Sequence, residues 1–94
     1  MAKKRERLQV IFDILKAISE KNGKIKPTHI LYKSNLSHQM MEEYLDELMG
    51  KGFVVEHNTK DGKTYSVTDK GFSYLQRYDV IVNFISSFGL DDAD

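Results

Sequence analysis

Ser34-Asn35-Leu36-Ser37 separates two stretches with helical periodicity and combines the signals for a tight turn and a new helix. The Ser37 hydroxyl can accept a hydrogen bond from an otherwise unpaired backbone N–H, which makes Ser37 the expected N-cap. Leu36 then precedes the cap and Met41 lies at the fourth helical position. At this spacing two apolar side chains pack against each other across the helix start, a contact known as a hydrophobic staple. Two helices joined by such a turn predict a helix-turn-helix.

The helices on either side of this turn can be bounded from the sequence. Pro27 fits the first turn of a short helix that runs to about Lys33. The next helix is expected to run to about Met49 and to stop at Gly50. The side chains expected to be buried on these two helices are Ile30, Leu31, Met40, Tyr44, Leu45 and Leu48.

Upstream of this pair, the chain predicts a first helix and a brief extended segment. Asn22-Gly23 ends the helix, because glycine suits the left-handed conformation after a helix C-terminus. Lys24-Ile25-Lys26 follows and is expected to form the first strand of a small sheet. The apolar stripe of the helix consists of Leu8, Ile11, Leu15 and Ile18, broadened by Val10, Ile14 and Ala17.

Downstream of the pair, two runs rich in β-branched and aromatic residues flank Lys60-Asp61-Gly62 and predict a hairpin. Two loop lengths are possible. A two-residue Asp61-Gly62 turn would set Val67 opposite Glu56, whereas a three-residue loop would set it opposite Val55. Because register follows the buried face, the three-residue loop is preferred. A hairpin directly after a helix-turn-helix is a wing.

The C-terminal part predicts a long helix that begins after Thr68 as N-cap. Phe72 and Leu75 are expected to pack on the domain. Farther along, apolar residues recur every three or four positions, as in a coiled-coil seam, with Val80, Val82 and Phe84 off the seam. We expect a second copy to cover this face; the alternative is a helix folded back across its own domain. The predicted dimer interface is Tyr74, Tyr78, Ile81, Val82, Ile85 and Phe88.

The composition fits one small globular domain. The 94 residues are 40% hydrophobic and 30% charged, which separates the chain from disordered proteins. There is no cysteine, so disulfides and thiolate metal sites are excluded. The N-terminus makes a poor signal peptide, and the longest apolar run, residues 80–85, is too short to span a bilayer. We therefore expect a cytoplasmic protein with no membrane partner.

The formal net charge of +0 averages over opposed blocks. Residues 1–33 carry +6, residues 34–50 carry −4, residues 51–77 carry +2 and residues 78–94 carry −4. Such asymmetry indicates faces with different partners. The helix after the turn contains neither Lys nor Arg.

Over about residues 5–78, the chain resembles small archaeal winged helix-turn-helix DNA-binding proteins, including chromatin-type members that dimerise through a C-terminal antiparallel coiled coil. The resemblance implies an α+β, mostly α fold in the order helix, strand, helix, helix, strand, strand, helix. It implies a winged domain over residues 1–71 and a dimerisation helix with an acidic tail over residues 72–94, together one structural unit. Relatives often have basic residues where this chain has His29 and Glu43. The matching segments are Thr28-His29-Ile30-Leu31-Tyr32-Lys33-Ser34-Asn35-Leu36-Ser37, Tyr44-Leu45-Asp46-Glu47-Leu48, Lys51-Gly52-Phe53-Val54 and Tyr65-Ser66-Val67-Thr68-Asp69-Lys70-Gly71.

In this family the helix after the turn enters the major groove of DNA and the wing follows the backbone or minor groove. The residues expected to contact bases are Ser37, His38, Gln39 and Glu42, whose side chains can donate to or accept from base edges. The alternative for Ser37 is that it only caps the helix. The alternative for Glu42 is that it lies on a solvated helix face without contacting DNA. The residues expected to contact phosphates are Lys3, Lys4, Arg5, Arg7, Lys26, Thr28, Lys33, Lys60 and Lys63.

The function predicted from these features is binding of double-stranded DNA as a homodimer, in transcriptional regulation or chromatin. The alternative is a winged-helix module for protein–protein contact in a transcription-related complex, which the acidic helix would allow. The three histidines form no metal-ligand pattern, and His57 is expected to face Tyr65 on the wing. No nucleophile turn or phosphate-binding glycine loop is present, so we expect neither enzymatic activity nor a cofactor or metal. The sequence leaves a small-molecule effector undetermined.

Overall fold

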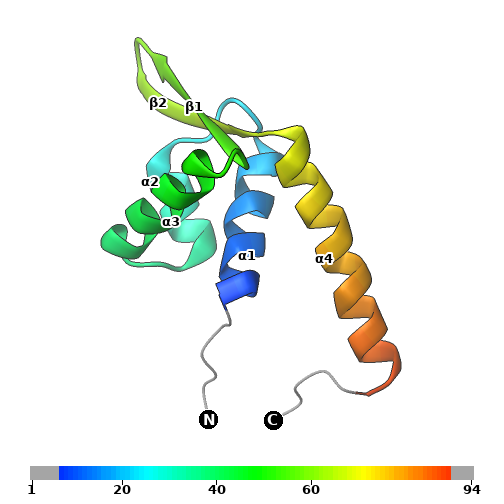
Figure 1. Cartoon of the computed structure of the whole chain (residues 1–94). Helices are drawn as coiled ribbons and strands as arrows, with labels where there is room; N and C mark the ends of the chain where they lie inside the picture. Colours follow the sequence, from blue (N-terminus) through cyan, green and yellow to red (C-terminus); the bar gives the residue numbers. More distant parts are fainter. Residues whose placement is uncertain (1–6, 90–94) are drawn as a thin grey trace.

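The computed structural model describes residues 7–89, which form four helices and a two-stranded antiparallel sheet (Figure 1). The elements are α1 (Arg7–Glu20), α2 (Pro27–Ser34), α3 (His38–Gly50), β1 (Val54–Thr59), β2 (Gly62–Val67) and α4 (Asp69–Ser87). The predicted α+β, mostly helical class and the order of its helices and hairpin are confirmed. The strand expected at residues 24–26 is a single bridge between Ile25 and Tyr65.

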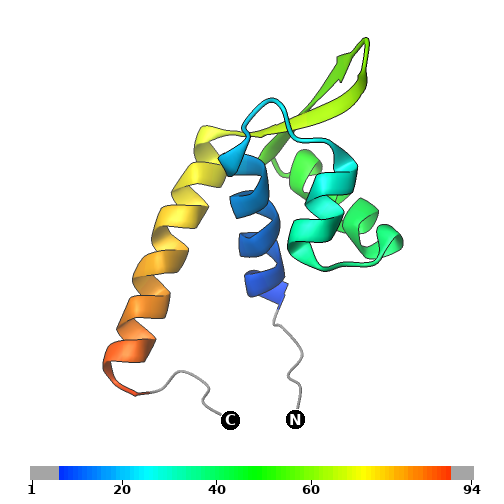
Figure 2. The same cartoon turned by 180° about the vertical axis from the view of Figure 1, so that it is seen from behind.

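The core lies where α1, the helix-turn-helix and the base of the hairpin meet. The α1 side chains Ile14, Leu15 and Ile18 are completely buried at its centre. In Figures 1 and 2, α1 stands between the α2–α3 pair and α4, so it contacts both sides of the molecule. Leu8, expected in the buried stripe, is 53% exposed because the packed part of α1 begins only at Val10.

The turn between α2 and α3 has the predicted local structure. Asn35 ends α2 in the left-handed conformation, and the Ser37 hydroxyl accepts a 3.2 Å hydrogen bond from the Met40 N–H. Leu36 is half-buried against the core and Met41 is fully packed in it. Met40, which was expected to be buried, is exposed instead, because the buried stripe of α3 is Met41, Leu45 and Leu48.

The register of the wing differs from both predicted registers. β1 pairs with β2 so that Val54 lies opposite Val67 and Glu56 lies opposite Tyr65. The register does follow the buried face, as expected, but the inward valine is Val54. Val55, which was predicted to lie inside, is 45% exposed on the outer face. The preferred three-residue loop is therefore wrong.

The loop of the wing consists of Lys60 and Asp61, and Gly62 is the first residue of β2. Gly62 has φ +117°, a conformation that favours glycine. The register also corrects the placement of His57, which lies opposite Thr64 and whose Nε2 is 2.6 Å from the Ser66 hydroxyl. His57 therefore does not face Tyr65.

α4 begins in close contact with the base of the wing. The Thr68 hydroxyl accepts a 3.2 Å hydrogen bond from the Gly71 N–H, as the predicted N-cap, and donates to the Gly52 carbonyl at 2.6 Å. A Cβ atom at Gly71 would lie 2.4 Å from Val67 Cγ1 and 2.6 Å from the Phe53 carbonyl oxygen. Glycine therefore permits the close approach of α4 to the hairpin.

The two halves of α4 have different surroundings. Leu75 packs on the core as expected, whereas Phe72, also expected to pack, is 39% exposed. The helix then continues past the body of the domain, as Figures 1 and 2 both show. Among residues 7–89 no helix is both long and apolar enough to cross a membrane.

Candidate nucleic-acid interface

α3 presents to solvent the side chains that were expected to contact bases. His38, Gln39 and Glu42 are all exposed. His38 Nδ1 lies 3.9 Å from Glu42 Oε1, and Gln39 Nε2 donates to a Glu43 carboxylate oxygen at 3.3 Å. Ser37 lies at the end of the same face, with its hydroxyl occupied as the cap of α3. The predicted base-contact residues therefore share one accessible edge of the molecule.

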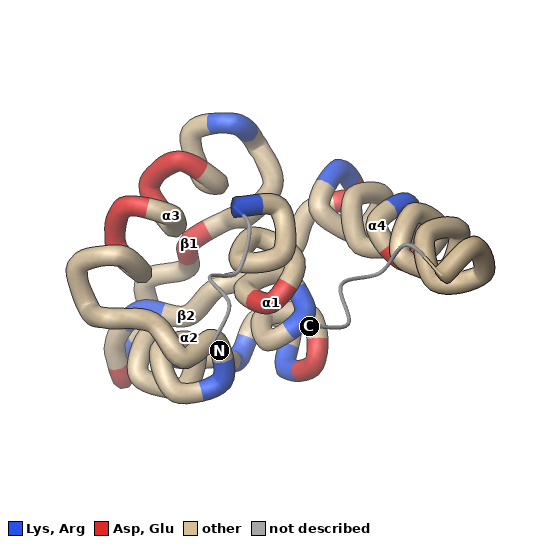
Figure 3. The backbone as a smooth tube through the Cα atoms, turned by 90° about the horizontal axis from the view of Figure 1, so that it is seen from below, with Lys and Arg blue, Asp and Glu red and all other residues tan. Residues whose placement is uncertain are grey.

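This edge is acidic. Figure 3 shows acidic positions gathered along α3. One of them, Glu47, is paired with Arg7 and lies 3.1 Å from Lys51 Nζ. The hydrogen bond from Arg7, reinforced by Lys51, lowers the pKa of Glu47 below its usual value. Glu42, Glu43 and Asp46 remain exposed, so α3 itself repels a phosphate backbone.

Those residues predicted to contact phosphates that the structure describes fall into two groups. The first group gathers at the wing, where Lys26 Nζ donates to the Asp61 carbonyl at 3.2 Å and so lies beside the loop. Lys60 is exposed in this loop, and Lys63 follows it on β2 with its Nζ 4.0 Å from Glu56 Oε2. Thr28 is exposed in the first turn of α2. The structure thus brings lysines from separate parts of the sequence to one end of the molecule.

The second group, Arg7 and Lys33, forms ion pairs with carboxylates on other helices. Arg7 pairs with Glu47 and lies over the Tyr44 ring, 5.7 Å from its centroid. Lys33 Nζ is 2.7 Å from Glu20 Oε1, a contact that lowers the pKa of Glu20. Lys3, Lys4 and Arg5 lie outside the described residues.

The residues predicted to form the dimer interface divide along α4. The Tyr74 hydroxyl donates to the Leu8 carbonyl at 2.6 Å, and the Tyr78 ring stacks on Phe12 with 4.7 Å between centroids. Both tyrosines therefore pack on α1 of the same chain. The remaining predicted residues, Ile81, Val82, Ile85 and Phe88, lie beyond this contact, and all except Ile85 are exposed.

Val80 and Phe84 lie off the predicted seam and are also apolar and exposed, at 67% and 60%. Their four-residue spacing, with Phe88 four residues later, places them along one side of α4. This spacing could have identified a second apolar stripe.

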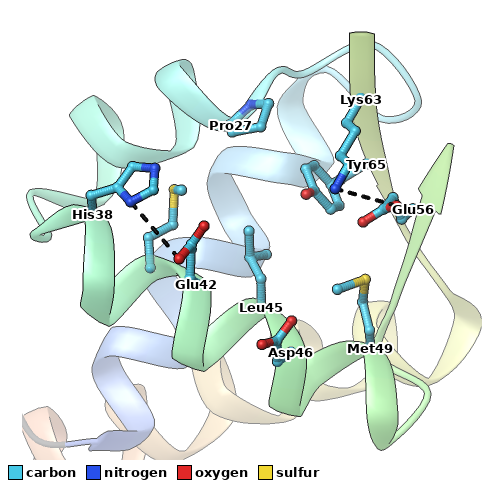
Figure 4. A pocket seen from close by; sticks show the side chains of 10 residues that line it. Pro27, His38, Glu42, Leu45, Asp46, Met49, Glu56, Lys63 and Tyr65 are labelled. Atoms are coloured by element: carbon cyan, nitrogen blue, oxygen red, sulfur yellow. Dashed lines mark ion pairs between the residues drawn. The ribbon is translucent and has the colours of Figure 1, made fainter. Parts of the chain in front are cut away.

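A groove that the sequence did not predict lies between α3, the start of α2 and the wing (Figure 4). Its volume is about 290 Å³. His38 and Glu42 line it from α3, together with Asp46 and Met49 farther along that helix, and Tyr65 and Glu56 line it from the wing. The i, i+4 spacing of Glu42 and Asp46 was visible in the sequence, but the wing wall depends on the tertiary fold.

Comparison with known proteins places this geometry in a family. Residues 4–86 match the family model described as winged helix-turn-helix. The chain belongs to the winged helix-turn-helix family. This family assignment agrees with the resemblance found in the sequence, and the α2–α3 pair and the wing described above are the elements that give the family its name.

Relatives of this winged helix-turn-helix chain include archaeal proteins. It is 32% identical to the uncharacterized protein MJ0290 of Methanocaldococcus jannaschii over 82 residues, 87% of this chain. The chain spans only 36% of the length of that relative.

Solved structures share its fold. Sso10a-2, a DNA-binding protein from Sulfolobus solfataricus, superposes with a TM-score of 0.69 over 96% of this chain and 100% of its own, at 22% identity. A mutant of MepR from S. aureus, bound to an oligodeoxyribonucleotide, superposes with a TM-score of 0.72 over 90% of this chain and 64% of its own, at 10% identity.

Proposed function

We propose that this chain binds double-stranded DNA through α3 and the wing. The observation that supports this most directly is the hydrogen bond from Lys26 to the Asp61 carbonyl, which places Lys26 beside Lys60 at the wing. Lysines at the wing next to an exposed helix suit a duplex, because the helix can enter the major groove while the lysines contact phosphates. Two structural neighbours, Sso10a-2 and MepR, are described as DNA-binding and DNA-bound.

The distribution of charge sets the expected character of this binding. The wing supplies cations, whereas Glu42, Glu43 and Asp46 on α3 oppose phosphates. Affinity then depends mainly on phosphate contacts, and Gln39 and His38 are the candidates for base contacts, through hydrogen bonds to base edges. The proposal therefore specifies modest, salt-sensitive binding with weak sequence selectivity.

Fluorescence anisotropy of a labelled duplex at several salt concentrations tests this proposal. The double variant Lys60→Ala, Lys63→Ala should bind more weakly, and its log–log salt slope should be smaller by about 1.8 for each chain bound, since each lost phosphate contact removes about 0.9. Arg77→Ala removes one exposed positive charge from α4, outside the wing, and serves as the control. No binding at low salt, or equal losses in both variants, would contradict the proposal.

We further infer that the chain forms a homodimer through the second half of α4. Four side chains there, Val80, Ile81, Phe84 and Phe88, are each more than half exposed. An apolar surface of this kind on a small domain is typical of an interface, and we propose that this interface includes Ile81, Val82, Ile85 and Phe88. Light scattering at tens of micromolar should give twice the mass of one chain; a monomer would contradict the inference.

The biological role follows from how selectively the dimer binds. We propose that it acts on the chromosome, as a transcriptional regulator or a chromatin protein, and not as an enzyme. Selection of bound sequences from a random duplex pool separates these roles, because a regulator enriches a palindrome and an architectural protein retains duplexes without enriching one. A chain that retains no duplex from the pool would contradict both roles.

A second candidate function is protein–protein contact through α3. It is favoured by the three exposed carboxylates on that helix, which suit a basic protein surface better than DNA. Under this function, the double lysine variant of the wing should retain its partner, whereas Glu42→Gln together with Glu43→Gln should lose it.

A further inference from the structure

The groove between α3 and the wing combines an apolar floor with an acidic rim. Met41, Leu45 and Met49 line it from α3, and Tyr65 lines it from β2 (Figure 4). Met41, Leu45 and Tyr65 are at most 5% exposed as residues, so this floor is fixed by the core. Methionine and leucine side chains of this kind accommodate aliphatic chains.

The rim carries more negative than positive charge. Glu42 and Asp46 lie on the α3 side and Glu56 lies on the wing (Figure 4). Lys63 is the one lysine among the lining residues, and its Nζ is 4.0 Å from Glu56 Oε2, the limit of an ion pair. With His38 neutral, the lining has a net charge of −2.

The negative charge of the rim affects the pKa of the Tyr65 phenol, which lies in the groove. Burial raises its pKa above the usual value, and the carboxylates of Glu56, Asp46 and Glu42 raise it further. The charges of all three residues therefore act on the same point in the groove, where the Tyr65 hydroxyl points in Figure 4. A cationic ligand there would meet all three carboxylates.

The carboxylates are spread out and not clustered. Glu42 and Asp46 are one helical turn apart, about 5–6 Å between Cβ atoms, and Glu56 belongs to the other wall. Within residues 7–89, no three acidic or histidine side chains are close enough together to hold one metal ion. The arrangement suits a ligand whose positive charges are separated along an apolar chain.

We propose that this groove binds a linear aliphatic polyamine. Its ammonium groups lie at Glu42, Asp46 and Glu56, and its methylene segments lie between them against Met49 and Pro27, the partly exposed apolar residues of the lining. Charge complementarity selects a polycation over an anion or a neutral ligand. The methylene segments cover the exposed apolar surface of Met49 and Pro27, whereas a hydrated metal ion would leave that surface in water.

A bound polyamine changes the face proposed for DNA. It offsets the carboxylates of α3 and so reduces the repulsion between this helix and phosphates. This consequence rests on the proposed DNA-binding function, whereas binding of the amine does not. The first test is therefore made without DNA.

Isothermal titration calorimetry of the full chain with spermidine at low ionic strength measures the binding. One spermidine per chain is expected. Glu56→Gln and Glu42→Gln should each weaken binding about threefold to fivefold, the range for one partly exposed ion pair. Glu43→Gln, which removes the same charge from α3 outside the groove, should change it less than about twofold.

NMR provides a second readout that does not depend on a variant. The methyl signals of Met41 and Met49 should shift as spermidine is added, and the methyl signal of Met40, outside the groove, should not. Equal losses in Glu43→Gln and Glu56→Gln, or methyl signals that do not respond, would overturn the proposal and indicate diffuse attraction. If spermidine binds as expected but the chain binds no DNA, the proposed function fails while this inference stands.

Discussion

The two halves of α4 belong to one continuous helix but meet opposite surroundings. In the first half, Gly71 is buried against the base of the wing, and Tyr74 and Tyr78 contact α1. In the second half, Phe84 and Phe88 contact each other at 4.9 Å between centroids and are both at least 60% exposed. Both halves carry apolar residues spaced three or four positions apart.

The difference shows that apolar periodicity does not reveal what covers a helix. The seam predicted from spacing began at Tyr74, yet Tyr74 and Tyr78 are covered by the chain's own α1. Only beyond them does α4 have an uncovered apolar surface. Substitutions in the first half should therefore affect folding, and substitutions in the second half should affect association.

The largest expected effect on folding is that of Gly71→Ala. The new methyl group would lie 2.6 Å from the Phe53 carbonyl oxygen, a backbone atom that cannot turn away, so α4 must shift from the wing. We expect a loss of about 3 kcal/mol in the free energy of unfolding, at the upper end for overpacking. Urea denaturation followed by circular dichroism measures it.

Gly50→Ala is the matched control for this prediction. Gly50 is also helical, but a Cβ there has no neighbour within 4 Å. It should leave stability unchanged or raise it slightly, because alanine is the better helix former. Equal stability of the two variants would show that α4 does not depend on close contact with the wing.

The next effect is that of Tyr78→Ala, which removes the ring stacked on Phe12. Because Tyr78 is only half-buried, we expect a loss of about 2 kcal/mol, below the range for a fully buried aromatic residue. Phe88→Ala removes an equally large ring from the second half, where the residue is 64% exposed. If Phe88→Ala destabilised a single chain as much as Tyr78→Ala, the division of α4 would be wrong.

Local signals in the sequence were enough to predict the helix-turn-helix and the start of α4. Ser37 and Thr68 each cap a helix within three residues of their hydrogen-bond donors, so their role depends on nothing distant. The register of the wing depends instead on which valine faces the core. Val54 and Val55 are equally apolar, and the choice is made by the contact of β1 with α3.

The candidate site was predicted only in part for the same reason. Exposed residues of α3 follow from helical periodicity, but the state of each basic residue depends on its spatial neighbours. Lys33 pairs with Glu20, thirteen positions away, and Arg7 pairs with Glu47, forty positions away. The groove beside Tyr65 likewise exists only once the wing has folded over α3.

A smaller effect is expected for Tyr74→Phe, which keeps the ring but removes the hydroxyl that donates to the Leu8 carbonyl. One such hydrogen bond contributes about 1 kcal/mol net, so thermal unfolding should occur a few degrees lower. Tyr32→Phe is the control, since Tyr32 is 73% exposed on α2. Identical melting temperatures for the two variants would mean that the hydrogen bond from the Tyr74 hydroxyl does not stabilise the contact between α4 and α1.

The smallest effect on a single chain is expected for Phe84→Ser in the second half of α4. Phe84 is 60% exposed, so the free energy of unfolding measured at submicromolar concentration should change by less than about 0.5 kcal/mol. At tens of micromolar, however, light scattering should show a shift toward monomer, because the proposed interface loses an aromatic ring. Tyr32→Ser removes a comparably exposed ring from α2 and should leave the mass unchanged. A Phe84→Ser variant that unfolds readily as a monomer would instead mean that its own chain covers this half of α4.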